Sequence, residues 1–227
     1  MIGLTVIDNN KRGEIMRNIF LFLTLGFTSI TFAGSHGKGM PHDASHESHG
    51  KYTITYEILD NSWDSGVNTI VGATLDEDDN GYGIVLGYDL GNNLVLEAAY
   101  RDLGQASLSG ASGNTFKYGG VAYTFNATAT VFVEADTLTL GLKKSFNFSD
   151  NLSVFARAGI HRYESTLGVT AATASVDTSN KDQDIYYGVG ASYSMGNIHL
   201  NIAHDTYDID YGEIDSTGIS LSYNLAF

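Results

Sequence analysis

The sequence predicts an all-β fold, an eight-stranded antiparallel up-and-down β-barrel that crosses a membrane. Three observations lead to this prediction. Apolar residues alternate with small or polar ones in eight segments, which is typical of strands with two different faces. Tight turns and long polar connections succeed one another along the chain. The composition, with 26 Gly, 14 Tyr and no Cys among 227 residues, favours strands over helices and excludes disulfides and zinc–thiolate sites.

The chain is acidic, with a formal net charge of −14. This charge argues against a nucleic-acid partner, because phosphate binding needs a basic face. It also argues against attraction to anionic lipid headgroups. Insertion of strands into a membrane is not excluded, because it depends on where the apolar residues lie.

The first fifty residues contain a secretory signal. Met16 and Arg17 precede an apolar run from Ile19 to Phe27, and Ala33 is a small residue suited to cleavage. The alternative, a transmembrane helix, needs a longer run. We therefore divide the chain into an upstream stretch before the true start (1–15), a signal peptide (16–33), a flexible periplasmic segment (34–50) and the barrel (51–227).

The segment 34–50 holds four of the seven histidines: His36, His42, His46 and His49. Cleavage after Ala33 would leave Gly34-Ser35-His36 at the mature terminus. Its amine, two amide nitrogens and imidazole can hold Cu(II) or Ni(II) in a square plane. The alternative is a solvated His-rich linker.

Eight strands follow in order, with apolar residues at every second position. They are expected at 52–58, 82–90, 94–101, 138–146, 154–161, 187–195, 198–203 and 217–227. Tight turns rich in Gly, Asn, Asp or Ser are expected at 91–93, 149–151 and 196–197. Long polar loops are expected at 61–80, 105–130, 165–184 and 209–215. Within them, 69–74 is compatible with a hairpin arm and 123–133 with an extension of the fourth strand.

Alternation alone also fits a soluble barrel, whose apolar face points inward. Here the second face is mostly Gly, Ser, Thr and Ala, which suits the narrow interior of eight strands. Aromatic residues such as Tyr82, Tyr100 and Phe146 lie near strand ends, and such rings favour membrane interfaces. The apolar face is therefore expected to meet lipid, with both termini at the periplasmic, tight-turn end.

Several of these stretches resemble the OmpA-type outer-membrane β-barrel family. Residues 81–104, GYGIVLGYDLGNNLVLEAAYRDLG, resemble strands two and three of that family. Residues 149–159 resemble its turn into strand five, and residues 187–193 resemble its strand six. The resemblance covers about 51–227. Because the chain stops at Phe227, we do not expect the peptidoglycan-binding activity that OmpA carries after its barrel.

The ending ISLSYNLAF resembles the C-terminal pattern that outer-membrane proteins present to their assembly machinery, with Tyr223, Leu225 and Phe227 as its apolar positions. The resemblance implies a bacterial outer-membrane location, reached through the inner membrane with a cleavable signal peptide. The expected partners are outer-membrane lipid, lipopolysaccharide and the β-barrel assembly machinery. We expect a monomer.

Charged residues on the inward face must pair, because unpaired buried charges are costly. Besides Asp89 and Asp205, they are Glu57, Glu97, Arg101, Lys143 and Arg157. Glu97, Lys143 and Arg157 fall at positions that resemble the family's interior ionic network. Two interpretations stay open: a permanent plug, and a gate whose pairs swap to open a narrow water path. A wide pore would need roughly 16–18 strands.

No catalytic residue is predicted, although some small barrels are proteases or lipid-modifying enzymes. His161, Tyr163 and His204 are expected in interior or interface packing. The acidic loops are expected to be solvated, or to bridge to lipopolysaccharide phosphates through divalent cations. The sequence thus predicts a structural or surface-interaction protein with a plugged lumen. The alternatives are a gated channel for small solutes and an outer-membrane enzyme.

Overall fold

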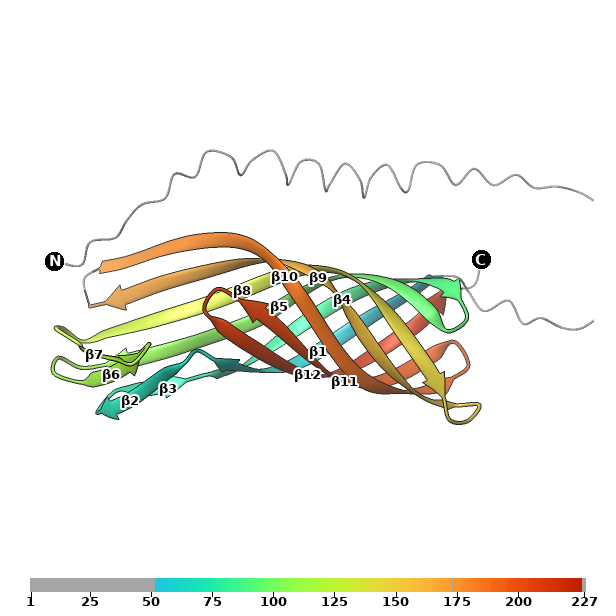
Figure 1. The fold of residues 1–227 in the computed structure, drawn as a ribbon, viewed down its shortest axis with the longest axis horizontal. Helices are drawn as coiled ribbons and strands as arrows, with labels where there is room; N and C mark the ends of the chain where they lie inside the picture. The colour runs from blue at the N-terminus through green and yellow to red at the C-terminus, as the bar shows by residue number, and fades with distance from the viewer. Residues whose placement is uncertain (1–51, 173, 226–227) are drawn as a thin grey trace, which may run out of the picture. The chain divides into compact units, whose positions relative to one another are not determined.

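Strands occupy almost all of the chain that the structure, a computed structural model, describes: residues 52–172 and 174–225 (Figure 1). Among these residues no helix is long and apolar enough to cross a bilayer. The strands are β1 (Tyr52–Asp64), β2 (Val67–Val71), β3 (Thr74–Asp76), β4 (Asp78–Gly91), β5 (Leu94–Gly110), β6 (Thr115–Tyr118), β7 (Val121–Thr124), β8 (Ala129–Asn147), β9 (Leu152–Ala171), β10 (Ala174–Met195), β11 (Ile198–Ile209) and β12 (Gly212–Leu225).

Eight of these strands close into a barrel. Their order is β5-β4-β1-β12-β11-β10-β9-β8, and β8 pairs with β5 to complete the ring. All neighbours are antiparallel. The short β3 pairs with the far end of β5, while β2, β6 and β7 form a separate three-stranded sheet. The predicted fold class is confirmed.

The tight turns lie at one end of the barrel, which we call the periplasmic end. Between β4 and β5 the chain reverses through Gly91, Asn92 and Asn93, with φ of 87°, 55° and 59°. Gly and Asn adopt this left-handed region at lower cost than other residues. The predicted turns at 149–151 and 196–197 also lie between strands at this end.

A belt of exposed apolar side chains surrounds the barrel. On β8 it runs from Leu138 to Phe146, in agreement with the about 9–11 residues that a tilted strand needs to cross a bilayer. Toward the other, extracellular end the outward positions become acidic: Asp60, Asp102, Asp136 and Asp215. Tyr100 marks this boundary, because its hydroxyl donates to Asp136 Oδ1 at 2.6 Å. The apolar face therefore points outward, as predicted.

Several strands continue well past the hairpin of β11 and β12 (Figure 1). β8, β9 and β10 contain 19, 20 and 22 residues. The expectation of loops at 61–80, 105–130 and 165–184 is therefore partly wrong, because strands β1 to β4 occupy most of the first stretch, β5 reaches Gly110, and β9 and β10 form a long hairpin. A ladder outside the membrane needs no apolar outer face, so the lipid-facing pattern fades while the strands persist. β2 overlaps the expected arm at 69–74.

Candidate functional site

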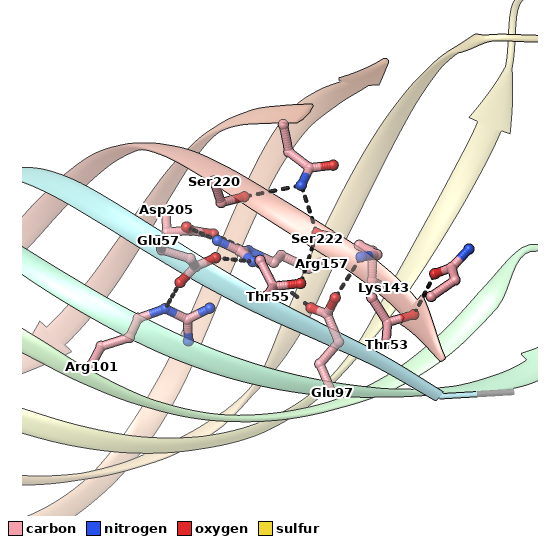
Figure 2. A network of polar contacts seen from close by, with 12 residues as sticks. Thr53, Thr55, Glu57, Glu97, Arg101, Lys143, Arg157, Asp205, Ser220 and Ser222 are labelled. Atoms are coloured by element: carbon pink, nitrogen blue, oxygen red, sulfur yellow. Dashed lines mark hydrogen bonds and ion pairs between the residues drawn. The ribbon is translucent and has the colours of Figure 1, made fainter. Parts of the chain in front are cut away.

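The lumen holds a network of three cationic and three anionic side chains (Figure 2). They are Arg101, Lys143, Arg157, Glu57, Glu97 and Asp205. They come from β1, β5, β8, β9 and β11, so the network joins five strands of the barrel. All side chains except that of Lys143 are at most 5% exposed. The formal charges cancel, as buried charges require.

Arg157 occupies the centre of the network (Figure 2). Its Nε donates to Asp205 Oδ1 at 2.6 Å and its Nη2 donates to Asp205 Oδ2, which gives a two-pronged pair. Its Nη1 donates to Glu57 Oε1 at 3.2 Å and lies 3.8 Å from Glu97 Oε2. A single cation thus links carboxylates from β1, β5 and β11.

Arg101 provides the second support of Glu57. Its Nε donates to Glu57 Oε2 at 2.7 Å, and its Nη1 donates to Thr139 Oγ1 at 3.0 Å. Each oxygen of Glu57 is therefore bound by a different arginine. The neighbouring inward glycines leave the necessary room, because a Cβ on Gly83 would collide with Glu57 and one on Gly188 would collide with Asp205.

Glu97 and Lys143 form the pair nearest the periplasmic end. Lys143 Nζ lies 2.6 Å from Glu97 Oε1, and the lysine side chain is 21% exposed. Its Nζ also lies 5.4 Å from the centroid of the Phe155 ring, a favourable cation–π position. Glu97 Oε2 is buried without a hydrogen-bond partner among the described residues. The carboxylate of Glu97 is therefore the least well satisfied of the network.

Small polar side chains fill the lumen next to the network. The hydroxyls of Thr55 and Ser222 are 2.7 Å apart. Asn201 Nδ2 donates to Ser220 Oγ at 3.0 Å and to Ser222 Oγ at 2.9 Å. The space left between these side chains and the ions is about 10 Å³, which is about the room that one water needs. This part of the lumen is packed rather than open.

An apolar layer fills the lumen on the extracellular side of the network. Tyr186 and Tyr207 stack with ring centroids 5.7 Å apart, and His161 packs against Tyr207 at 5.5 Å. The apolar and aromatic members are all at most 7% exposed: Leu59, Trp63, Leu103, Ala106, Val133, Ala135, Tyr163, Tyr186, Tyr207, Ile209 and Ile214. The lumen therefore contains two packed layers of different chemistry, one ionic and one apolar.

His161 and Tyr163 are engaged in packing. His161 is fully buried; its Nε2 faces the Asp208 carbonyl at 2.9 Å and its Nδ1 faces Thr137 Oγ1 at 3.1 Å. Because a carbonyl only accepts, Nε2 carries a proton. The Tyr163 hydroxyl accepts from the Asp210 N–H at 3.0 Å. Burial and the Asp210 carboxylate raise the pKa of Tyr163, a residue beyond the apolar belt.

The remaining expected residues lie apart from the network. His204 points outward, with its Nδ1 3.0 Å from Thr217 Oγ1. Asp89 is exposed near the periplasmic turn, where its Oδ1 accepts from the Gly91 N–H. Tyr223 and Leu225 lie on β12 and pair with Ile54 and Tyr52 of β1. Outside the described residues lie Phe227, His36, His42, His46 and His49.

The sequence prediction did not include the apolar layer. One usable signal is the parity of β1, because Trp63 stands at an even spacing from inward-facing Glu57. Another is the adjacent pair Tyr186 and Tyr187, since neighbouring strand residues point to opposite faces. Tyr187 is 54% exposed, whereas Tyr186 is 1% exposed.

The chain is similar to a known protein family and to solved structures. The model of the OmpA-like transmembrane domain matches residues 39–211. No curated protein matches. The structure of Ail, the attachment invasion locus protein of Yersinia pestis, in complex with the heparin analogue sucrose octasulfate, has a TM-score of 0.50 at 12% identity and covers 78% of this chain and 99% of that chain.

Two Pseudomonas aeruginosa structures are similar over the same share of this chain. The outer-membrane protein OprG has a TM-score of 0.49 at 10% identity, with 97% of its chain covered. The N-terminal β-barrel domain of OprF has a TM-score of 0.44 at 16% identity, with 99% of its chain covered. At such identities the likeness concerns the fold alone.

Proposed function

Since the chain belongs to the family of OmpA-like transmembrane domains and is an outer-membrane β-barrel, we propose that it is a structural and surface-interaction protein with a closed lumen. The presence of two packed layers in series, which would act as an ionic and an apolar closure, carries this proposal. Rearranging the ion pairs would leave the apolar layer in place. Conduction would therefore need both a rearrangement of the ion pairs and an opening of the apolar layer. The extracellular extension of the barrel remains available for interactions with other molecules.

A narrow channel for small solutes is the second candidate. It is supported by the position of Glu97, whose Oε1 lies 2.6 Å from Lys143 and whose Oε2 lies 3.8 Å from Arg157. A small rotation of the Glu97 side chain would exchange Lys143 for Arg157 as the closer partner of its carboxylate. Such an exchange could open the ionic closure, provided that the apolar layer also yields.

Single-channel conductance of the refolded protein in a planar bilayer distinguishes the closed lumen from the narrow channel. The closed-lumen proposal predicts no reproducible open level for the wild type or for Lys143→Ala. Lys144→Ala is the matched control, because Lys144 donates to the Asn92 carbonyl at the periplasmic turn and takes no part in the network. A reproducible open level changed by Lys143→Ala or Glu97→Ala would favour the gated channel instead.

We propose no enzymatic activity. The strongest candidate base, His161, uses both ring nitrogens in contacts that hold β9 to β8 and β11. We also propose that the barrel contacts outer-membrane lipid and lipopolysaccharide as a monomer. Its C-terminal residues Tyr223, Leu225 and Phe227 would guide the assembly machinery, which is consistent with the role of β12 as the strand that pairs with β1.

From the sequence we further propose secretion with cleavage after Ala33 and binding of Cu(II) or Ni(II) by the mature N-terminus. The expected ligands begin with the free amine and His36. Copper titration of the mature protein is expected to show a site that His36→Ala weakens at least tenfold. Equal binding by the two proteins would remove the amino-terminal site and leave His42, His46 and His49 as a solvated linker.

A further inference from the structure

A cavity of about 230 Å³ lies in the extracellular extension. Its walls include Leu75, Leu108, Phe116, Val131 and Leu167. Ser65 and Ser107 are the lining residues that lack an apolar or aromatic side chain. No charged side chain lines it, so an ion placed inside would lose its hydration without gaining a partner.

A bulge in β5 builds one wall of the cavity. Leu103 and Gly104 together stand opposite Ala135 of β8, so the ladder shifts between Asp102 and Gln105. This extra residue reverses the faces of β5. On the periplasmic side of the bulge the odd-numbered residues of β5 point inward. On its extracellular side the even-numbered residues Ala106 and Leu108 point inward, as their burial shows.

The small sheet of β2, β6 and β7 forms the cover. Val67 stands directly opposite Tyr118 in this sheet, and Phe116 lies two residues away on the same face. Phe116 is held by Tyr123 and Phe125, with ring centroids 5.4 Å and 5.3 Å away. These aromatic contacts brace the cover against collapse into the cavity.

The floor of the cavity is the apolar layer of the lumen. Ala106 and Val133 belong to both, and Leu167 and Tyr211 pack against that layer. The cavity is thus separated from the ionic network by buried side chains. Tyr118 also lines the cavity and is 47% exposed, so the cavity is reached from the outside and not from the periplasm.

We propose that this cavity binds a small uncharged apolar molecule, of about the size of naphthalene, from the extracellular side. An apolar cavity of roughly 150 Å³ binds benzene, and this one is larger. The carboxylate of Glu77, which accepts from the hydroxyl of the lining residue Ser65, disfavours an anionic ligand. The inference does not rest on the ionic network, because the buried apolar layer separates the cavity from those charges.

Methyl NMR of the full mature protein in nanodiscs, titrated with naphthalene, tests the proposal. Ring currents are expected to shift the methyl signals of Leu75, Leu108 and Leu167 to saturation. The methyl signals of lipid-facing Leu140 and Leu200 report naphthalene dissolved in lipid and are expected to drift without saturation. Drift without saturation at all five leucines would overturn the proposal.

Two variants assign the binding to this cavity. Val131→Phe fills it and is expected to abolish the saturable shifts. Val169→Phe is the matched control, because Val169 is the cross-strand partner of Val131 but is 42% exposed and does not line the cavity. Leu108→Phe is a second filling variant, and unchanged signals from Leu140 and Leu200 verify that each variant folds. Saturable shifts that survive both filling variants would contradict the proposal.

A charged analogue tests whether the cavity requires an uncharged ligand. The anion 2-naphthalenesulfonate has the same ring system and is expected to give no saturable shift up to concentrations tenfold above those that saturate with naphthalene. Equal affinity for the two compounds would refute the requirement for an uncharged ligand.

Discussion

Arg157 is the residue whose loss leaves the most charge unpaired. Arg157→Met would strand Asp205 and leave Glu57 with Arg101 alone. Removing one partner of a buried ion pair costs about 3–5 kcal/mol. We expect the free energy of unfolding to fall by that amount in urea titrations of the protein folded into lipid vesicles.

Substitutions of two lysines serve as comparisons for the loss of stability in Arg157→Met. Lys144→Met at the turn is expected to change the free energy of unfolding by no more than about 0.5 kcal/mol. Lys143→Met is expected to fall between the two, because its amine is partly exposed and water can reach the freed carboxylate of Glu97. Equal decreases in the free energy of unfolding of all three variants would show that Arg157 contributes no more to stability than a lysine at the turn.

The charged residues of the network could be read from the sequence, but their pairing could not. Parity places Glu57, Arg101 and Arg157 inside, since each stands at an inward position of its strand. Which atoms meet depends on the tilt and stagger of strands around the barrel. Arg157 and Asp205 are 48 residues apart and lie on strands that are not neighbours, so local spacing does not bring them together.

At the scale of elements, alternation predicts strands well only where lipid surrounds them. β8 is recognisable from Leu138 onward because its outward residues, apart from Lys144 near the turn, are Leu and Phe. Its first part, from Ala129, has Glu134 and Asp136 on the outer face, and the sequence indicates it less clearly, as an extension of the fourth strand within 123–133. The bulge at Gly104 adds a second obstacle, because it moves the apolar residues of β5 from one parity to the other.

The bulge can be tested with two glycines of matched backbone. Gly104 and Gly66 have φ of 69° and 65°, so alanine at either carries the same strain, of order 1–3 kcal/mol. A Cβ on Gly104 would also press on Asp79, whose Oδ2 accepts from the Gln105 N–H, whereas Gly66 faces open space. We expect Gly104→Ala to lower the free energy of unfolding by about 1 kcal/mol more than Gly66→Ala.

Hydrogen exchange gives the independent readout of that comparison. Gly104→Ala is expected to speed exchange of the β5 amides from Gln105 to Gly110 while leaving those of Leu94 to Arg101 protected. Gly66→Ala should leave both groups unchanged. Uniform loss of protection along β5 would show that the bulge is not a separate joint.

Over the whole molecule, the barrel reverses its polarity at the edge of the membrane. Within the belt the outer face is apolar and the lumen is ionic. Beyond the belt, acidic residues such as Asp136 face water while Trp63, Tyr207 and Ile214 fill the interior, as in a soluble domain. In each half the inward face is shielded from the surroundings. The half in lipid therefore buries charged side chains, and the half in water buries apolar ones.

This arrangement predicts that the two closures act in series. Lys143→Ala alone, or Tyr186→Ala with Tyr207→Ala alone, should each leave one closure intact and give no steady current in a planar bilayer. The triple variant should conduct small ions, because both the ionic and the apolar barrier are then weakened. The matched control joins Lys144→Ala with Tyr187→Ala, since both residues lie outside the lumen. If Lys143→Ala alone conducts steadily, the apolar layer is no barrier and the lumen is controlled by its ions.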